Sequence, residues 1–316
     1  MLNPSLPPLI SILGPTASGK SSLALEIAQK FNGEIISCDS MQVYREMNIG
    51  SATPSQEELD SIPHHLVNIL DISEGYDVQK FIELAEAKIL DIHARGKLPI
   101  LTGGTGMYAR LLLYGFDLLP SDKELSLKIR QEFADNGTEA LLEELKAIDP
   151  ETAERVAANP RHLKRAVEVI RLTGEKVPFK TSWGEQVRYP GKQFILIPDP
   201  DYSRSRISKR TVEMLNEGWI EEAEHLMMNK GLLDSPTALQ SLGYREIIQL
   251  IKGEFPGGKE ALTEKLITLT CRYAKRQRTW FRNQHPGAEK FSYSNQIEFR
   301  AVADEIEQSI KGLDFK

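Results

Sequence analysis

The residues best suited to chemistry lie in a glycine-rich segment near the start of this 316-residue chain. The segment matches the G-x-x-x-x-G-K-[ST] pattern of phosphate-binding loops at every fixed position. It consists of Gly14, Pro15, Thr16, Ala17, Ser18, Gly19, Lys20 and Ser21. In such a loop, backbone N–H groups and a helix N-terminus hold a polyphosphate, the lysine reaches the terminal phosphates, and the serine ligates Mg²⁺. A plain glycine turn between a strand and a helix is the structural alternative.

The elements around this loop have the order that a phosphate-binding loop needs. An apolar run over 9–13 precedes it, and an amphipathic stripe of Leu23, Ile27 and Phe31 follows it. Further strand patterns lie at 34–39, 67–71 and 98–102, separated by a helical pattern over 76–96. Strands that alternate with helices predict an α/β fold with a parallel, P-loop NTPase-like sheet.

Two polar residues lie at the carboxyl ends of two predicted strands. Asp39 ends the strand at 34–39, and Thr105 lies in the glycine turn 103–106 after the strand at 98–102. The carboxyl ends of parallel strands meet at one edge of a sheet, so both residues are expected beside the phosphate loop. For Asp39 the alternative is an N-cap of the next segment. For Thr105 the alternative is a turn that merely allows close packing.

The pattern changes after residue 120. Residues 121–175 read as helical throughout, a strand returns at 193–198, and long helices are predicted over 202–231 and 258–283. We therefore divide the chain into the first part of the core, 1–120, an all-helical insertion, 121–190, and the completion of the core with basic C-terminal helices, 191–316.

Composition sets broad limits on the class of protein. Hydrophobic residues make up 41% and charged residues 27% of the chain, which is typical of a globular protein. No apolar run is long enough to span a membrane, and no secretory signal precedes the first strand. Cys38 and Cys271 are too far apart in sequence to suggest a metal or disulfide framework. We expect a cytoplasmic protein without a membrane partner.

The net charge of −6 argues against nucleic-acid binding, but the basic residues are clustered. The segment 270–282 holds five basic residues and no acid, interleaved with Tyr273 and Trp280. A second basic cluster lies at 161–165, and a third at the start of the helix 202–231. Such clusters suit a phosphate backbone with bases stacked nearby, whereas solvated basic surfaces are the alternative.

These features leave several reactions open. A small-metabolite kinase would use Asp39 to accept a proton from a hydroxyl, with Arg206 or Arg210 on the transferred group. The basic clusters are superfluous for such a kinase and favour a nucleic-acid substrate. A polyphosphate site together with a nucleic-acid substrate is consistent with transfer of a group that leaves from a diphosphate. A non-catalytic, nucleotide-dependent RNA-binding protein is a third class.

Several motifs together resemble those of the bacterial tRNA dimethylallyltransferases, in order along nearly the whole chain. Besides the phosphate loop, they are the segments 39–45, 49–52, 63–66, 103–108, 164–169, 239–244, 273–277 and 279–282. Departures from the family pattern fall at Thr53, Ser126 and the pair Arg161-His162, all outside the catalytic set.

The resemblance implies transfer of a dimethylallyl group from dimethylallyl diphosphate to N6 of the adenosine 3′ to the anticodon. It implies that the loop Gly14–Ser21 holds the diphosphate, with Mg²⁺ on Ser21, and that the protein binds the anticodon stem-loop of tRNA. We expect the protein to be a monomer. The implied catalytic residues are Asp39 as general base, Thr105, Lys20, Arg206 and Arg210. The implied tRNA-binding residues are Asp39, Ser40, Met41, Gln42, Arg161, His162, Leu163, Lys164, Arg165, Arg272, Lys275, Arg276 and Arg278.

Overall fold

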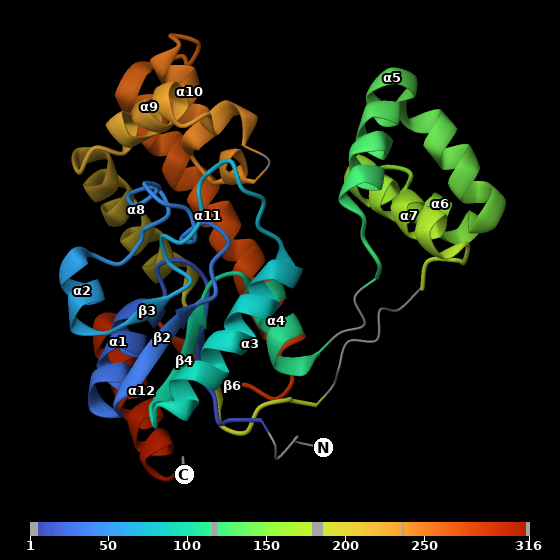
Figure 1. The fold of residues 1–316 in the computed structure, drawn as a ribbon. Helices are drawn as coiled ribbons and strands as arrows, with labels where there is room; N and C mark the ends of the chain where they lie inside the picture. The colour runs from blue at the N-terminus through green and yellow to red at the C-terminus, as the bar shows by residue number, and fades with distance from the viewer. Residues whose placement is uncertain (1–5, 116–118, 179–185, 236, 314–316) are drawn as a thin grey trace. The chain divides into compact units, whose positions relative to one another are not determined.

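The computed structural model describes residues 6–115, 119–178, 186–235 and 237–313. The chain forms two compact units, one of Met1–Tyr114 with Glu185–Lys316 and one of Gly115–Gly184. Figure 1 shows the first unit as a sheet with helices and the second as helices only. The insertion of 121–190 that the sequence predicts overlaps the second unit over most of its length.

The first unit is built on a six-stranded sheet whose strands are all parallel. Its strand order is β3-β2-β4-β1-β5-β6. The strands are β1 (Ile10–Leu13), β2 (Gly33–Ser37), β3 (His64–His65), β4 (Leu98–Gly103), β5 (Gln193–Pro198) and β6 (Glu289–Tyr293). The predicted α/β fold with a parallel sheet is confirmed.

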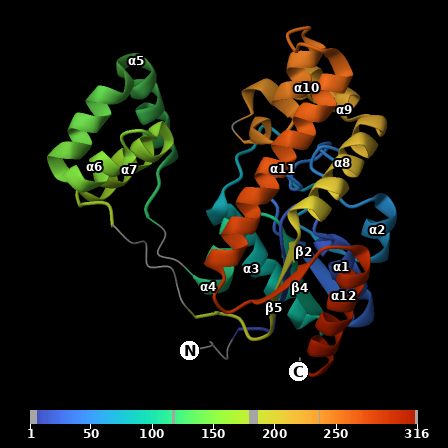
Figure 2. The ribbon, with the colours of Figure 1, turned by 180° about the vertical axis from the view of Figure 1, so that it is seen from behind.

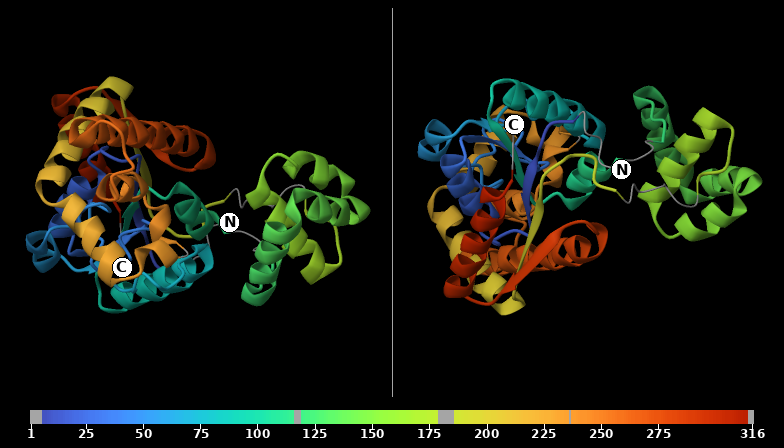
Figure 3. Two further views of the ribbon diagram at one scale, coloured as in Figure 1. Left: turned by 90° about the horizontal axis from the view of Figure 1, so that it is seen from above. Right: turned by 90° about the horizontal axis from the view of Figure 1, so that it is seen from below.

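Helices cover both faces of this sheet, because its central strands alternate apolar side chains between two cores. On one face, Ile10 and Ile12 pack with α1 (Lys20–Lys30) and α12 (Gln296–Lys311). On the other face, Leu13 and Leu101 pack with α3 (Val78–Ala94) and α4 (Gly106–Tyr114). Figure 3 looks at these layers from above and from below.

The remaining helices of this unit extend beyond the sheet, as Figure 2 shows from behind. Helix α8 packs along α11, and α9 packs against α10. These elements are α2 (Gln56–Ser61), α8 (Pro200–Asn216), α9 (Trp219–Asn229), α10 (Tyr244–Ile251), α11 (Gly258–Gln284) and the short 3-10 helices η1 (Leu232–Asp234) and η2 (Ala238–Gln240).

The second unit contains α5 (Lys123–Ile148), α6 (Pro150–Val156) and α7 (Pro160–Thr173) around a core of their apolar stripes. Asp149 ends α5 and caps α6 through the amide of Thr152, which turns the chain sharply between them. Pro160 stands in the first turn of α7, and Gly174 ends that helix with φ 70°.

Three predicted elements differ from the structure. The strand predicted at 67–71 is wrong: the strand there is His64–His65, since Leu66 and Asn68 have positive φ angles that a strand does not allow. The single helix predicted over 202–231 is two helices, because Gly218 adopts φ 103° between α8 and α9. The helix over 258–283 is not the last element, since β6 and α12 follow it.

Candidate active site

The glycine-rich loop joins β1 to α1 as predicted. Ala17 and Gly19 adopt positive φ angles of 60° and 82°, which turn the loop back on itself before Lys20 begins the helix. Gly19 caps α1 without a side-chain hydrogen bond. The first amides of α1 are therefore not satisfied by a capping side chain, which is the usual arrangement for binding an anion.

Residues from distant elements hold this loop in shape. Arg206 of α8 donates from Nε to the carbonyl of Ala17 at 2.9 Å, and Tyr293 of β6 donates its hydroxyl to the carbonyl of Ser18. A Cβ atom at Gly19 would lie 2.9 Å from the ring of Phe299 in α12. The missed elements β6 and α12 therefore support the loop, and Arg206 contacts its backbone.

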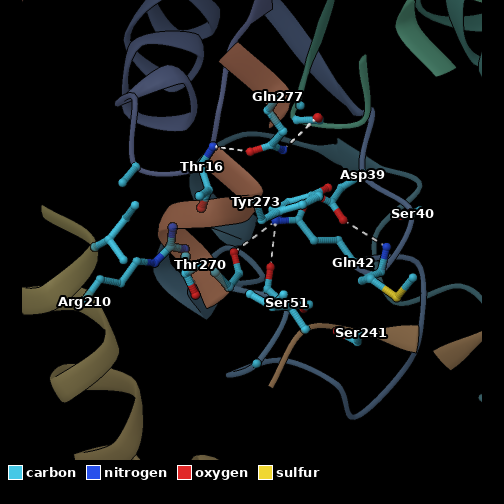
Figure 4. A pocket seen from close by; sticks show the side chains of 18 of the residues that line it. Thr16, Asp39, Ser40, Gln42, Ser51, Arg210, Ser241, Thr270, Tyr273 and Gln277 are labelled. Atoms are coloured by element: carbon cyan, nitrogen blue, oxygen red, sulfur yellow. Dashed lines mark hydrogen bonds between the residues drawn. The ribbon is translucent and has the colours of Figure 1, made fainter. Parts of the chain in front are cut away.

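A cavity of about 370 Å³ opens over the loop at the carboxyl ends of the strands. Figure 4 shows side chains from α8, α11 and the strand-end loops that line it. Of the predicted site residues, its lining includes Thr16, Ala17, Lys20, Ser21, Asp39, Ser40, Met41, Gln42, Arg210 and Arg276. The structure thus brings Asp39 and the phosphate loop to one cavity.

A second cavity of about 400 Å³ shares part of its lining with the first. Lys20, Ser21 and Arg210 line both cavities, whereas Arg206 lines only the second. Of the two candidate arginines, Arg210 is therefore the one that shares a cavity with Asp39.

The carboxylate of Asp39 is held by a backbone amide two residues further along the chain. Its Oδ1 accepts a hydrogen bond from the amide of Met41 at 2.9 Å, so one carboxylate oxygen caps the turn that follows β2. This turn does not lead directly into a helix. The carboxylate of Asp39 therefore caps a turn and not a helix, which was the alternative role considered for it. Asp39 also lines the cavity.

The cations of this cavity are perturbed by their burial. Burial lowers the pKa of Lys20 to about 8, with Asp39 acting to raise it and Arg210 to lower it. Burial also lowers the pKa of Arg210, against the opposing effect of Asp39. Lys20 contacts the carbonyl of Pro15 at 3.2 Å. A bound anion would offset the cost of gathering these charges.

Thr105 lies close to Asp39 but is not among the lining residues of either cavity. Its Oγ1 accepts a hydrogen bond from the amide of Ser40 at 3.2 Å, and its own amide donates to the carbonyl of Cys38 at 3.2 Å. In this structure Thr105 therefore holds the segment that carries Asp39.

The basic residues of α11 divide between two faces. Arg272, Lys275 and Arg276 are exposed, and Arg276 lies with its guanidinium 5.6 Å from the ring centre of Tyr273. Arg278 differs from them because only 9% of its surface is exposed. The prediction that Arg278 lies on the RNA-binding face is not supported by its position, since the periodicity of α11 turns it inward.

The predicted RNA-binding segment of α7 divides in the same way. Arg161 and His162 are exposed in the first turn. Leu163 is fully buried in the core of the second unit, so its side chain packs there, and its contact with RNA stays a prediction. Arg165 pairs with Glu168 at 2.7 Å, and Lys164 lies 4.6 Å from the ring centre of Phe133.

Two residues that sequence reasoning missed shape the cavity walls. Gln277 of α11 contacts the amide of Thr16 and the carbonyl of Gly104. Glu222 of α9 accepts hydrogen bonds from the amides of Asn48, Ile49 and Gly50 at 2.7–3.0 Å. Gln277 ends the motif 273–277, but the motif does not reveal its partners. Glu222 has no local sequence signal, because the loop it binds is more than 170 residues away.

The chain is similar to known proteins along nearly its whole length. A family model described as IPP transferase matches residues 42–284. The chain is similar to the tRNA dimethylallyltransferase of Geobacillus thermodenitrificans, with 40% identity over 311 residues that cover 96% of each protein. It is also similar to the tRNA dimethylallyltransferase of Acetivibrio thermocellus, with 41% identity over 314 residues that cover 97% of this chain and 96% of the relative.

Two solved structures resemble the fold. The full-length tRNA isopentenylpyrophosphate transferase from Bacillus halodurans has 35% identity and a TM-score of 0.67, covering 96% of this chain and 97% of that chain. A eukaryotic dimethylallyltransferase acting on tRNA has 26% identity and a TM-score of 0.82, covering 97% of this chain and 79% of that chain.

Proposed function

The chain belongs to the IPP transferase family, and from this membership we propose that it transfers a dimethylallyl group from dimethylallyl diphosphate to tRNA. The acceptor we propose is N6 of the adenosine 3′ to the anticodon. One observation carries the proposal: Asp39, the phosphate loop and Arg210 line one cavity. A carboxylate and an anion-binding loop at one cavity suit a reaction that removes a proton from one reactant and a diphosphate from the other.

The loop and the cations around it are proposed to hold the diphosphate. The bond from the allylic carbon to the diphosphate oxygen breaks with the electron pair going to oxygen, so stabilising the leaving diphosphate is the main demand. The first amides of α1, Lys20 and Arg210 are suited to this role by position and charge. We also propose that the hydroxyl of Thr105 donates a hydrogen bond to the bridging oxygen of the diphosphate.

Mg²⁺ would be held by the hydroxyl of Ser21, which lines both cavities next to Lys20. Within the described residues, no group of three or more His, Cys, Asp and Glu side chains is arranged to hold a metal. The donor set therefore fits an ion that takes its other oxygen ligands from the diphosphate and from water, as Mg²⁺ commonly does. There it would neutralise charge on the leaving diphosphate.

Asp39 is proposed as the general base. The lone pair of the adenine N6 amine is delocalised into the ring, so the amine is a weak nucleophile. As the new N–C bond forms, the N6 proton passes to the carboxylate of Asp39 and the diphosphate departs. The turn through Met41 and the contact of Thr105 with Ser40 hold this carboxylate in place.

The exposed cations of α11 are proposed to bind the RNA backbone. Arg272, Lys275 and Arg276 lie along one exposed part of the helix, and Tyr273 and Arg276 also line the cavity. The target adenosine would leave the anticodon stack to enter it. Arg161 and His162 of the second unit are proposed as further contacts.

A monomeric state and a cytoplasmic location stay predictions. No described helix is long and apolar enough to cross a membrane.

The small-metabolite kinase is the less favoured alternative. A kinase would need an acid for its metal, and besides Asp39 the residue Asp71 ends an apolar stretch. Asp71 is exposed, pairs with Arg45 at 3.4 Å and is absent from the lining of both cavities. The similarity to tRNA-modifying enzymes also favours the transferase over the kinase and over a non-catalytic RNA-binding protein.

The test is incubation with Mg²⁺, dimethylallyl diphosphate and an anticodon stem-loop, read by mass spectrometry. We expect the RNA to gain one dimethylallyl group, and Asp39→Asn to reduce the rate by about 10²–10⁴-fold with RNA binding retained. Steep dependence of RNA binding on salt is expected as well. No gain in RNA mass, together with ATP consumption on a hydroxylated metabolite, would favour the kinase instead.

A further inference from the structure

The two glycine-containing turns of the site lie on neighbouring strands. The phosphate loop follows β1, and the turn of Gly103 to Gly106 follows β4, with Leu13 and Gly103 in register across the pair. The amide of Gly14 donates to the carbonyl of Gly103 at 3.4 Å, which is a long hydrogen bond. This hydrogen bond is weak, so a second contact has to hold the phosphate loop and the turn after β4 at a defined distance.

Gln277 supplies that connection. Its Oε1 accepts a hydrogen bond from the amide of Thr16 at 2.9 Å, and its Nε2 donates to the carbonyl of Gly104 at 2.8 Å. Both bonds are drawn in Figure 4. The side chain is 8% exposed, and a Cβ atom at Gly104 would lie 2.6 Å from Nε2. Only a glycine at 104 allows this approach.

The chemistry of the contact explains why a carboxamide is present. One partner is a backbone donor and the other a backbone acceptor, so the side chain must accept at one atom and donate at the next. An ionised carboxylate accepts only, and the cations of Lys and Arg donate only. Gln277 is thus matched in polarity to both turns.

The turn of Gly103 to Gly106 also holds the segment that carries Asp39. Thr105, next to Gly104, accepts from the amide of Ser40 and donates from its own amide to Cys38. A continuous series of hydrogen bonds therefore runs from Thr16 through Gln277 and the 103–106 turn to the residues on either side of Asp39. This series links the leaving-group site to the proton acceptor.

We propose that Gln277 is a positioning residue that sets the distance between the diphosphate loop and the general base. This inference rests on the proposed function. Loss of the carboxamide lets the two turns move apart, so the transfer step slows while the exposed cations of α11 still bind RNA. A displacement of about 1 Å at a reacting centre costs roughly a hundredfold in rate.

The first test replaces Gln277 by Met, which has similar length and neither hydrogen bond. We expect kcat/KM for dimethylallyl diphosphate to fall about a hundredfold, with the Kd for the stem-loop unchanged within about twofold. Retention of kcat and KM within about twofold would overturn the proposal, as would a parallel loss of RNA affinity. Wild-type protein without any transfer activity would instead refute the proposed function.

The second test uses Gln277→Glu and has a readout that a purely structural role would not move. A protonated Glu accepts at one oxygen and donates at the other, as the carboxamide does, whereas the ionised form repels the carbonyl of Gly104. The ratio of variant to wild-type activity is therefore expected to rise as pH falls, by up to about tenfold per pH unit. A ratio that stays low and flat with pH would contradict the proposal.

Other charged groups around this position affect both proteins alike, so the ratio is the useful quantity. They are Lys20, Asp39, Arg210, Tyr273 and Arg276, which line the same cavity. Asn283→Asp, on an exposed position of the same helix, makes the same chemical change and is expected to leave the ratio near one. If both Gln277 variants melt below the assay temperature, the residue is a stability determinant and the proposal fails.

Discussion

The hydroxyl of Thr105 lies 3.2 Å from the backbone amide of Ser40, across two loops that are 65 residues apart in sequence. This contact holds the residue that follows Asp39. The hydroxyl accepts in this contact and keeps its own hydrogen to donate. The position of Asp39 in the cavity therefore depends on the turn after β4 as well as on its own strand.

Thr105→Val tests this relationship, because it keeps the shape of the side chain and removes the hydroxyl. We expect the transfer rate to fall by about tenfold, the cost of roughly one hydrogen bond, with little change in RNA affinity. Thr105→Ser keeps the hydroxyl and is expected to retain most activity. Single-turnover kinetics with saturating dimethylallyl diphosphate measure the effect, and equal rates for Val and Ser variants would contradict it.

Lys20 makes diphosphate binding depend on pH. Burial lowers the pKa of its ammonium to about 8, while Asp39 raises it and Arg210 lowers it. Diphosphate binds the charged form, so affinity is expected to be highest below this pKa and to fall as pH rises through it. Calorimetric titration with inorganic diphosphate, from about pH 7 to about pH 9, measures the change across the midpoint.

Lys20→Arg is the matched control, because a guanidinium stays charged throughout this range. Its affinity for diphosphate is expected to be weaker but nearly independent of pH. If the variant and the wild type lose affinity in parallel, a group other than Lys20 causes the dependence.

Gly50 cannot carry a side chain. A Cβ atom there would lie 2.2 Å from Nε1 of Trp219 and 2.3 Å from the hydroxyl of Tyr244, which itself donates to Glu222 at 2.6 Å. Gly50→Ala is therefore expected to lower the free energy of unfolding by about 1–3 kcal/mol. Gly75→Ala is the control, since a Cβ there meets nothing within 4 Å. Urea unfolding compares them, and equal midpoints would contradict the packing.

The two faces of α7 give opposite predictions. Leu163 is fully buried among α5, α6 and α7, so Leu163→Ala is expected to destabilise the second unit by about 2–5 kcal/mol. Arg161 is exposed, so Arg161→Ala is expected to leave stability unchanged and to weaken RNA binding. Thermal melting and RNA titration of both variants separate the effects. Normal RNA affinity in Arg161→Ala would remove it from the RNA-binding surface.

The sequence by itself determined the phosphate loop, the sheet around it and the placement of Asp39 near that loop. These features follow from local rules: glycines at fixed spacing, apolar runs of strand length and the shared edge of parallel strands. Local signals also account for the start of α2, which Ser55 caps, and for the first turn of α7 at Pro160.

Only the tertiary structure decided which side chains hold the loop and which face the cavity. The carboxamide of Gln277 meets the amide of Thr16 from 261 residues away, and Glu222 reaches the 48–50 loop from another helix. No local pattern could tell that Arg278 is buried, because the buried face of a long, polar helix is set by the neighbours against which it packs. Long-range contacts of this kind leave no mark in the local sequence.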